Sequence, residues 1–195
     1  MLAALAVAPA AGHATSKKPC KPGPNVGCPF RHLDGRDFAG LELWHSFWER
    51  ASLAGASFKH SDLFGAGFKD ARLTKADLSF GNRTRANFRN ANLSDANLAH
   101  ADFYGSNLRN AKLRRATFDG TKFDAVDLSY ADLTGARIRN SSFAGAKLCH
   151  TIQPNGKERN NNCTAADRAR GKGKAKGTGG SGKWNTSTIP GREKG

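Results

Sequence analysis

Long apolar segments and aromatic residues are scarce in this chain of 195 residues. Hydrophobic residues make up 38% of the sequence and aromatic residues 9%, a low share for a single compact core of the usual kind. No apolar run reaches the ~20 residues that a helix needs to cross a bilayer. We therefore expect no transmembrane helix in the mature chain, and a core built in some way other than by ordinary globular packing.

The sequence also lacks the short motifs of common enzymes. Neither the G-x-S-x-G of hydrolases nor the H-E-x-x-H of zinc peptidases occurs. Residues 177–183 spell G-x-x-x-x-G-K, but Trp184 follows where a phosphate-binding loop needs Ser or Thr. We expect no catalytic activity, no cofactor and no small-molecule substrate.

Only four cysteines are present, and they fall into two local pairs: Cys20 with Cys28, and Cys149 with Cys163. Four cysteines allow three connectivities, and sequence does not select among them. The local pairing is favoured because each pair brackets one end of a regular central region, which two short disulfide loops would stiffen. No metal site is expected, because no C-x-x-C occurs and Cys149-His150 is the only close pair of metal-ligating residues.

The first fourteen residues, MLAALAVAPAAGHA, are small and apolar and contain Ala-x-Ala-like cleavage points. They resemble the later part of a signal peptide. The positively charged start of such a peptide is missing, which indicates that the true start lies upstream. An Ala-rich terminus without structure is the alternative. With the paired cysteines, this segment predicts a secreted protein.

A five-residue repeat dominates the rest of the chain. Every fifth residue from Leu33 to Leu148 is large and apolar in 23 of 24 consecutive pentads, with Arg83 as the exception. The residue two positions before is small, most often Ala, and the residue between them is often Asp or Asn.

A period of five fits neither an α-helix nor a simple strand, because residues at this spacing would not line one face of either. It makes sense if each pentad is one straight edge followed by a corner, and if four edges close a square coil. Each coil would stack on the last at about 4.8 Å. Four pentads per turn are supported by a column that is leucine throughout, taken every twenty residues: Leu33, Leu53, Leu73, Leu93, Leu113 and Leu133.

The pattern A-(D/N)-L-x-x resembles that of the pentapeptide-repeat family, and the match runs from about Arg31 to His150. The flanks CKPGPNVGC and CHTIQPNGKERNNNC look like the cysteine-framed ends of secreted bacterial members. The resemblance implies an all-β fold: a right-handed quadrilateral β-helix, a solenoid of about six coils of four pentapeptides.

This interpretation divides the chain into five parts. They are a signal-peptide-like segment (1–14), an N-terminal cap or linker (15–30), the β-helix (31–150), a C-terminal cap loop (151–163) and a disordered basic tail rich in Gly and Lys (164–195).

Arg83 is the one inward position that is not apolar, and an unpaired buried guanidinium would be very unfavourable. We expect a local bulge at 81–85 that turns this side chain outward. The functional alternative is that the bulge displays Arg83 and Arg85 to a partner.

The outward positions suggest a binding surface. One column carries the aromatic residues Trp44, Phe64 and Tyr104, and the equivalent column of the next face carries the cations Lys69, Arg89 and Arg109, with Arg85 at the corner between them. Such residues stack on sugars or bases and bind phosphate or carboxylate polymers. The alternative is that the aromatic residues pack under the N-terminal segment or form a homodimer contact.

The formal net charge is +15, much of it near the chain ends. We therefore expect a non-catalytic exported scaffold that binds an unknown protein or an anionic polymer: cell wall, lipid headgroup or nucleic acid. The alternative is a nucleic-acid-binding protein or a DNA mimic. Some family members mimic DNA and bind DNA gyrase, but that role implies an acidic cytoplasmic rod.

Overall fold

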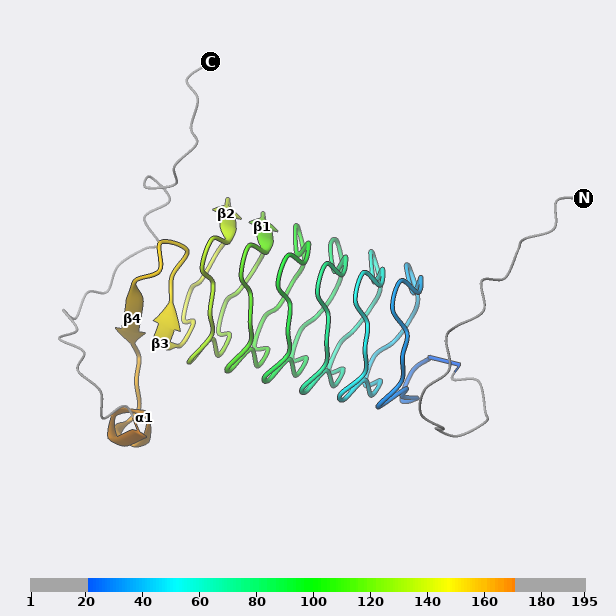
Figure 1. The fold of residues 1–195 in the computed structure, drawn as a ribbon, viewed down its shortest axis with the longest axis horizontal. Helices are drawn as coiled ribbons and strands as arrows, with labels where there is room; N and C mark the ends of the chain where they lie inside the picture. Colours follow the sequence, from blue (N-terminus) through cyan, green and yellow to red (C-terminus); the bar gives the residue numbers. More distant parts are fainter. Residues whose placement is uncertain (1–20, 171–195) are drawn as a thin grey trace, which may run out of the picture.

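The computed structural model describes residues 21–170, most of which form a row of coils stacked along one long axis (Figure 1). Parallel bridges join residues twenty apart, from His32↔Ser52 to Asp132↔Ile152. Four such ladders run the length of the solenoid, one along each side of the coil. Two neighbouring edges pair regularly enough to form strands: β1 (Thr117–Asp119) and β2 (Arg137–Arg139) lie parallel, with Phe118 opposite Ile138.

Each pentad forms a short edge and a turn, as residues 48–51 illustrate. The amide of Trp48 donates to Gly67 O of the next coil at 2.7 Å, which holds neighbouring coils together. The amide of Ala51 donates back to Trp48 O at 3.1 Å and closes the corner. Arg50, the third residue of this turn, has φ 56°. A positive φ at the third position is the mark of a type II turn.

The preference for Asp or Asn before each inward residue has a local cause. The side-chain oxygen at this position accepts the backbone amide two residues further along, as between Asp62 Oδ1 and the amide of Phe64 at 3.0 Å. Asn92 makes the same bond to the amide of Ser94 at 3.1 Å. These side chains therefore satisfy the amide that enters each corner, and their regular spacing carries no catalytic meaning.

The expected burial of every fifth side chain is confirmed. Leu53 and the later leucines of its column are fully buried, while Leu33 and Phe143 are partly buried near the two ends. Rings also stack from coil to coil. Trp48 lies 5.9 Å from Phe68, and Phe68 lies 4.8 Å from Phe88, with ring planes within 3° of parallel.

The prediction that Arg83 turns outward is wrong: its side chain is fully buried inside the coil. The guanidinium donates to Ser61 O at 2.8 Å and to Phe58 O at 2.5 Å, both in the preceding coil. Burial lowers the pKa of Arg83 to about 10, while the nearby carboxylates of Asp77 and Asp62 oppose the shift. The group therefore stays charged at neutral pH, paired with backbone carbonyls instead of a carboxylate.

The space for this guanidinium comes from Gly81. A Cβ at this position would lie 1.5 Å from Arg83 Nη1 and 2.4 Å from Ser61 O. Most other pentads carry Ala two residues before the inward side chain, so the glycine and the arginine form a matched substitution. The register of the coils is kept, because Asn82 still pairs with Asp62 and Asp102, but the corner at 78–81 lacks the amide-to-carbonyl bond that closes most other corners.

The coil begins earlier than the expected start at residue 31. The amides of Asn25 and Cys28 donate to Trp44 O and Phe47 O, in the same register as the later coils. Cys28 is 1% exposed and occupies the inward position twenty residues before Trp48. It is disulfide-bonded, whereas Cys20, its expected partner, lies outside the described residues together with the signal-peptide-like segment.

The C-terminal end is closed by a hairpin and a short helix (Figure 1). Strands β3 (Leu148–Ile152) and β4 (Glu158–Asn161) are antiparallel, with Thr151 opposite Arg159. The sulfur atoms of Cys149 and Cys163 are joined at 2.10 Å.

The prediction of a disordered tail from residue 164 is wrong for its first residues, because Ala165–Arg170 forms helix α1. The remainder of that tail lies outside the described residues. Within residues 21–170, no helix has the length and apolar character to cross a membrane.

The Gly81–Arg83 pair can be tested by a double-mutant cycle. Gly81→Ala alone should destabilise the protein by about 1–3 kcal/mol, because the added methyl group overlaps the guanidinium. Adding Arg83→Leu should recover this loss, since Ala and Leu are the residues of the other pentads. Denaturant unfolding of the two single variants and the double variant measures the coupling. Additive effects would contradict the packing described here.

Candidate functional site

The predicted aromatic column is partly assembled, with a histidine between its members. The ring of His45 lies 6.0 Å from Trp44 and 5.3 Å from Phe64, edge-on to both. Gly65 makes room for it, because a Cβ there would lie 2.5 Å from His45 Nδ1. The aromatic pattern of the sequence did not indicate His45, because this residue occupies the corner position next to the aromatic column. Trp44 and Phe64 are half-buried.

Arg85 joins this aromatic group from the next coil. Its guanidinium carbon lies 6.0 Å from the centroid of the Phe64 ring, at the outer limit of a cation–π contact. Tyr104 is 51% exposed and lies two coils beyond Phe64. The structure thus brings Trp44, Phe64 and Arg85 together. Tyr104 lies in the coil that follows Arg85, whose amide donates to Tyr104 O at 2.9 Å, but among the described residues its ring stacks on none of these three side chains.

The basic column is divided. Lys69 and Arg89 are exposed, and no ion pair within residues 21–170 involves either of them or Arg85. Several other cations of the solenoid are paired with carboxylates, as Arg115 is with Asp95 at 2.7 Å. This hydrogen-bonded pair lowers the pKa of Asp95 and raises that of Arg115.

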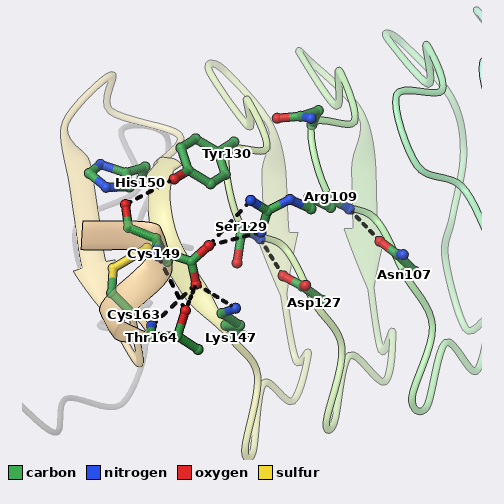
Figure 2. A network of polar contacts seen from close by, with 12 residues as sticks. Asn107, Arg109, Asp127, Ser129, Tyr130, Lys147, Cys149, His150, Cys163 and Thr164 are labelled. Carbon is green, nitrogen blue, oxygen red and sulfur yellow. Dashed lines mark hydrogen bonds and ion pairs between the residues drawn. A yellow bond between two sulfur atoms is a disulfide. The ribbon is translucent and has the colours of Figure 1, made fainter. Parts of the chain in front are cut away.

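Arg109 differs from its expected role as a free cation of the surface. Its guanidinium lies 4.6 Å above the ring of Tyr130 and donates to Asp167 Oδ1 at 3.2 Å (Figure 2). Asp167 belongs to α1, so the third member of the predicted basic column is used within the chain, where it holds the C-terminal helix.

Asp167 is the centre of this C-terminal clasp and is almost fully buried. Lys147 Nζ lies 2.7 Å from Asp167 Oδ2, which also accepts from the hydroxyl of Thr164 at 2.6 Å. The amide of Asp167 donates to Thr164 Oγ1 at 3.2 Å, a reciprocal arrangement that resembles a capping box at the start of α1. Hydrogen bonds from Lys147, Thr164 and Arg109 hold the pKa of Asp167 well below its ordinary value.

The structure also gathers Cys149, His150 and Cys163, whose ligand atoms lie within 4.8 Å of one another. The sequence showed only the first two as neighbours, because Cys163 is brought to them by the β3–β4 hairpin. This cluster lies at the C-terminal end of the rod, away from the aromatic group.

The clasp predicts a definite response to acid. A carboxylate whose pKa is lowered by folding contributes stability above its ordinary pKa, and this is lost as the pH falls through the folded value. Docking of α1 should therefore weaken below about pH 4. In Asp167→Asn, docking should already be weak at pH 7 and change little with acid. Hydrogen exchange of the α1 amides measures this. Asp95→Asn, which removes a carboxylate far from α1, is the control, and equal pH profiles for Asp167→Asn and the parent would contradict the assignment.

Known proteins resemble the chain in sequence pattern and in structure. Models of pentapeptide repeats, in eight copies, match residues 37–70, 49–79, 84–120 and 118–152, which together make up more than half of the chain. No curated protein matches it.

Several solved structures are similar. A pentapeptide repeat protein from the Arabidopsis thaliana thylakoid lumen is 30% identical with a TM-score of 0.35; the match covers 62% of this chain and 63% of that one, less than two thirds of its length. HetL, involved in heterocyst differentiation regulation in the cyanobacterium Nostoc, is 22% identical over 69% of this chain and 90% of its own, with a TM-score of 0.34.

A pentapeptide repeat protein from the cyanobacterium Cyanothece is 24% identical over 62% of this chain and 83% of that one, with a TM-score of 0.36. Such scores carry no argument about function. The repeat models, the buried pentad positions and the four ladders at twenty-residue spacing agree with one another. The chain belongs to the pentapeptide-repeat family.

Proposed function

We propose that this protein is an exported, non-catalytic scaffold that binds an anionic polymer. The binding surface consists of Trp44, Phe64, Arg85, Lys69 and Arg89, with Tyr104 at its edge; the basic segment 171–195 adds electrostatic affinity. The observation that carries the proposal is the position of Arg85 over Phe64. Two further exposed cations on the next face, Lys69 and Arg89, have no acidic partner among the described residues.

The chemistry of this surface suits a chain of repeated anionic groups. Lys69 and Arg89 occupy equivalent positions in successive coils, so they present positive charge at a repeat of about 4.8 Å along the rod. A single small anion would engage one of them, whereas a polymer lying along the rod can engage both and also reach Arg85. The rings of Trp44 and Phe64 offer apolar surface to sugars or bases on the neighbouring face of the rod.

Two features support export. The apolar segment 1–14 has the composition of a signal peptide, and the bond between Cys149 and Cys163 belongs to the kind that persists in oxidising compartments. An exported protein meets anionic wall polymers and lipid headgroups, and these are the partners we propose first.

The surface is tested by charge-matched variants of the full chain. Lys69→Ala/Arg89→Ala should weaken binding to polyglycerol phosphate and lower the slope of log affinity against log salt by about 1–2. Lys75→Ala/Lys112→Ala, which removes two exposed cations from another face, should change the slope far less. Binding is measured by titration at several salt concentrations. Equal losses in the two variants would show that net charge alone acts and that the surface has no role.

The contribution of the basic segment 171–195 can be measured apart from that of the surface, provided that the deletion leaves the docked helix α1 in place. Deleting 171–195 preserves the clasp around Asp167. This deletion should reduce affinity further in the Lys69→Ala/Arg89→Ala background, while the parent without 171–195 should keep salt-dependent binding. Loss of all binding on deletion alone would refute the surface. Parallel titrations with duplex DNA and anionic vesicles identify which polymer class binds most tightly.

A further inference from the structure

The C-terminal end of the solenoid carries a cluster that the proposed scaffold function does not use: Cys149, Cys163 and His150. We infer that, when the disulfide is reduced, these three side chains form a Zn²⁺ site. Their ligand atoms already lie within 4.8 Å of one another. In a tetrahedral site, ligands about 2.0–2.3 Å from zinc lie roughly 3.5–3.8 Å apart, so the cluster is close to the size required.

His150 provides the observation that points to a ligand. Its Nε2 atom is buried and has no hydrogen-bond partner within the described part of the chain. Its Nδ1 atom lies 2.5 Å from Glu158 Oε1. A carboxylate on one ring nitrogen, with the other nitrogen left free, is the arrangement that orients histidine ligands in metal sites. A buried nitrogen without a partner is otherwise unfavourable.

The imidazole is also held in place. The Tyr130 ring stacks on it with centroids 4.9 Å apart, and the amide of His150 donates to Asn160 Oδ1 at 2.9 Å (Figure 2 shows the tyrosine and histidine rings). Tyr130 is itself fixed, because Arg109 lies over its ring and its hydroxyl donates to Asp167 O at 3.3 Å. The ring therefore needs little ordering on binding, which favours affinity.

The disulfide is reduced by a dithiol. The reductant gives two electrons and two protons to the Cys149–Cys163 bond, which becomes two thiols, and is itself oxidised to a disulfide. Each thiol then loses a proton as its sulfur binds Zn²⁺. The two sulfur atoms, no longer bonded to each other, then lie roughly 3.8 Å apart when they share one Zn²⁺. Cys163 lies in the loop between β4 and α1, outside both elements.

The site would keep the end of the rod closed under reducing conditions. Cys163 is followed directly by Thr164, which caps α1 through Asp167. Zinc held by Cys149 and Cys163 replaces the covalent link with a coordinate one, so α1 stays near the solenoid. Three protein ligands leave a fourth position for water.

The experiment uses the full chain, treated with a dithiol and exchanged into metal-free buffer with a phosphine reductant. Co²⁺ is added as a spectroscopic probe and then displaced with Zn²⁺. We expect one equivalent of Co²⁺ per chain, with thiolate-to-cobalt absorption that Zn²⁺ abolishes. Cys20→Ser/Cys28→Ser should leave this signal intact, which assigns it to the C-terminal pair. The oxidised protein should give none.

The histidine is tested separately. His150→Ala should weaken Zn²⁺ binding at least tenfold in competition with a chromogenic chelator, and Glu158→Gln should weaken it by about 10–100-fold. His100→Ala, a histidine on another corner, should have no effect. Each variant is first compared with the parent in its oxidised form by thermal unfolding, so that a folding defect is recognised. Absence of cobalt–thiolate absorption in the reduced parent, or undiminished zinc affinity in both His150→Ala and Glu158→Gln, would overturn the site.

Discussion

The backbone hydrogen bonds between coils are the constraint on which the rest of the structure depends. Inward residues donate their amides to the coil that follows, as Trp48 does to Gly67 and Leu53 to Arg72. These bonds require a whole number of residues in each turn of the solenoid. Four pentads, each with one corner, set that number at twenty. Because the side chain between two ladder bonds must point inward, the interior is a tube one side chain deep, in which Leu and Phe stack on copies of themselves.

Such a tube explains how Arg83 is tolerated. A guanidinium in a globular core needs a carboxylate or water, whereas a solenoid interior is lined by turn carbonyls at regular intervals. Arg83 reaches two of these, Phe58 O and Ser61 O. At the equivalent position of the neighbouring coils, a backbone amide fills this role: the amide of Asp102 donates to Gly81 O, and the amide of Asp62 donates to Leu41 O. Ser61 O accepts from the guanidinium of Arg83 instead. The guanidinium thus takes the place of a backbone amide in the ladder of hydrogen bonds.

The periodic parts of the fold follow from sequence, and the parts that break the period do not. Burial of Leu53 or Phe68 could be read from a single rule, because every coil offers the same environment. The outcome for Arg83 needed a pair of positions to be considered together, and Gly81, which departs from the Ala of most other pentads, was the available signal. Arg109 had no such signal: its partner Asp167 lies 58 residues further on and is delivered by a hairpin and a helix outside the repeat.

This division also determines where function can reside. Along the sides, equivalent positions recur at each coil, so a cation such as Lys69 or Arg89 contributes to binding together with its neighbours in the same column. The ligand that suits such a surface is one whose charged groups also repeat. At the C-terminal end the repeat stops, and the chain can fold back to bring unlike groups together. The clasp at Asp167 and the grouping of Cys149, Cys163 and His150 both arise there. A single specific site is therefore expected at an end of the rod, and an extended, cumulative surface along its sides.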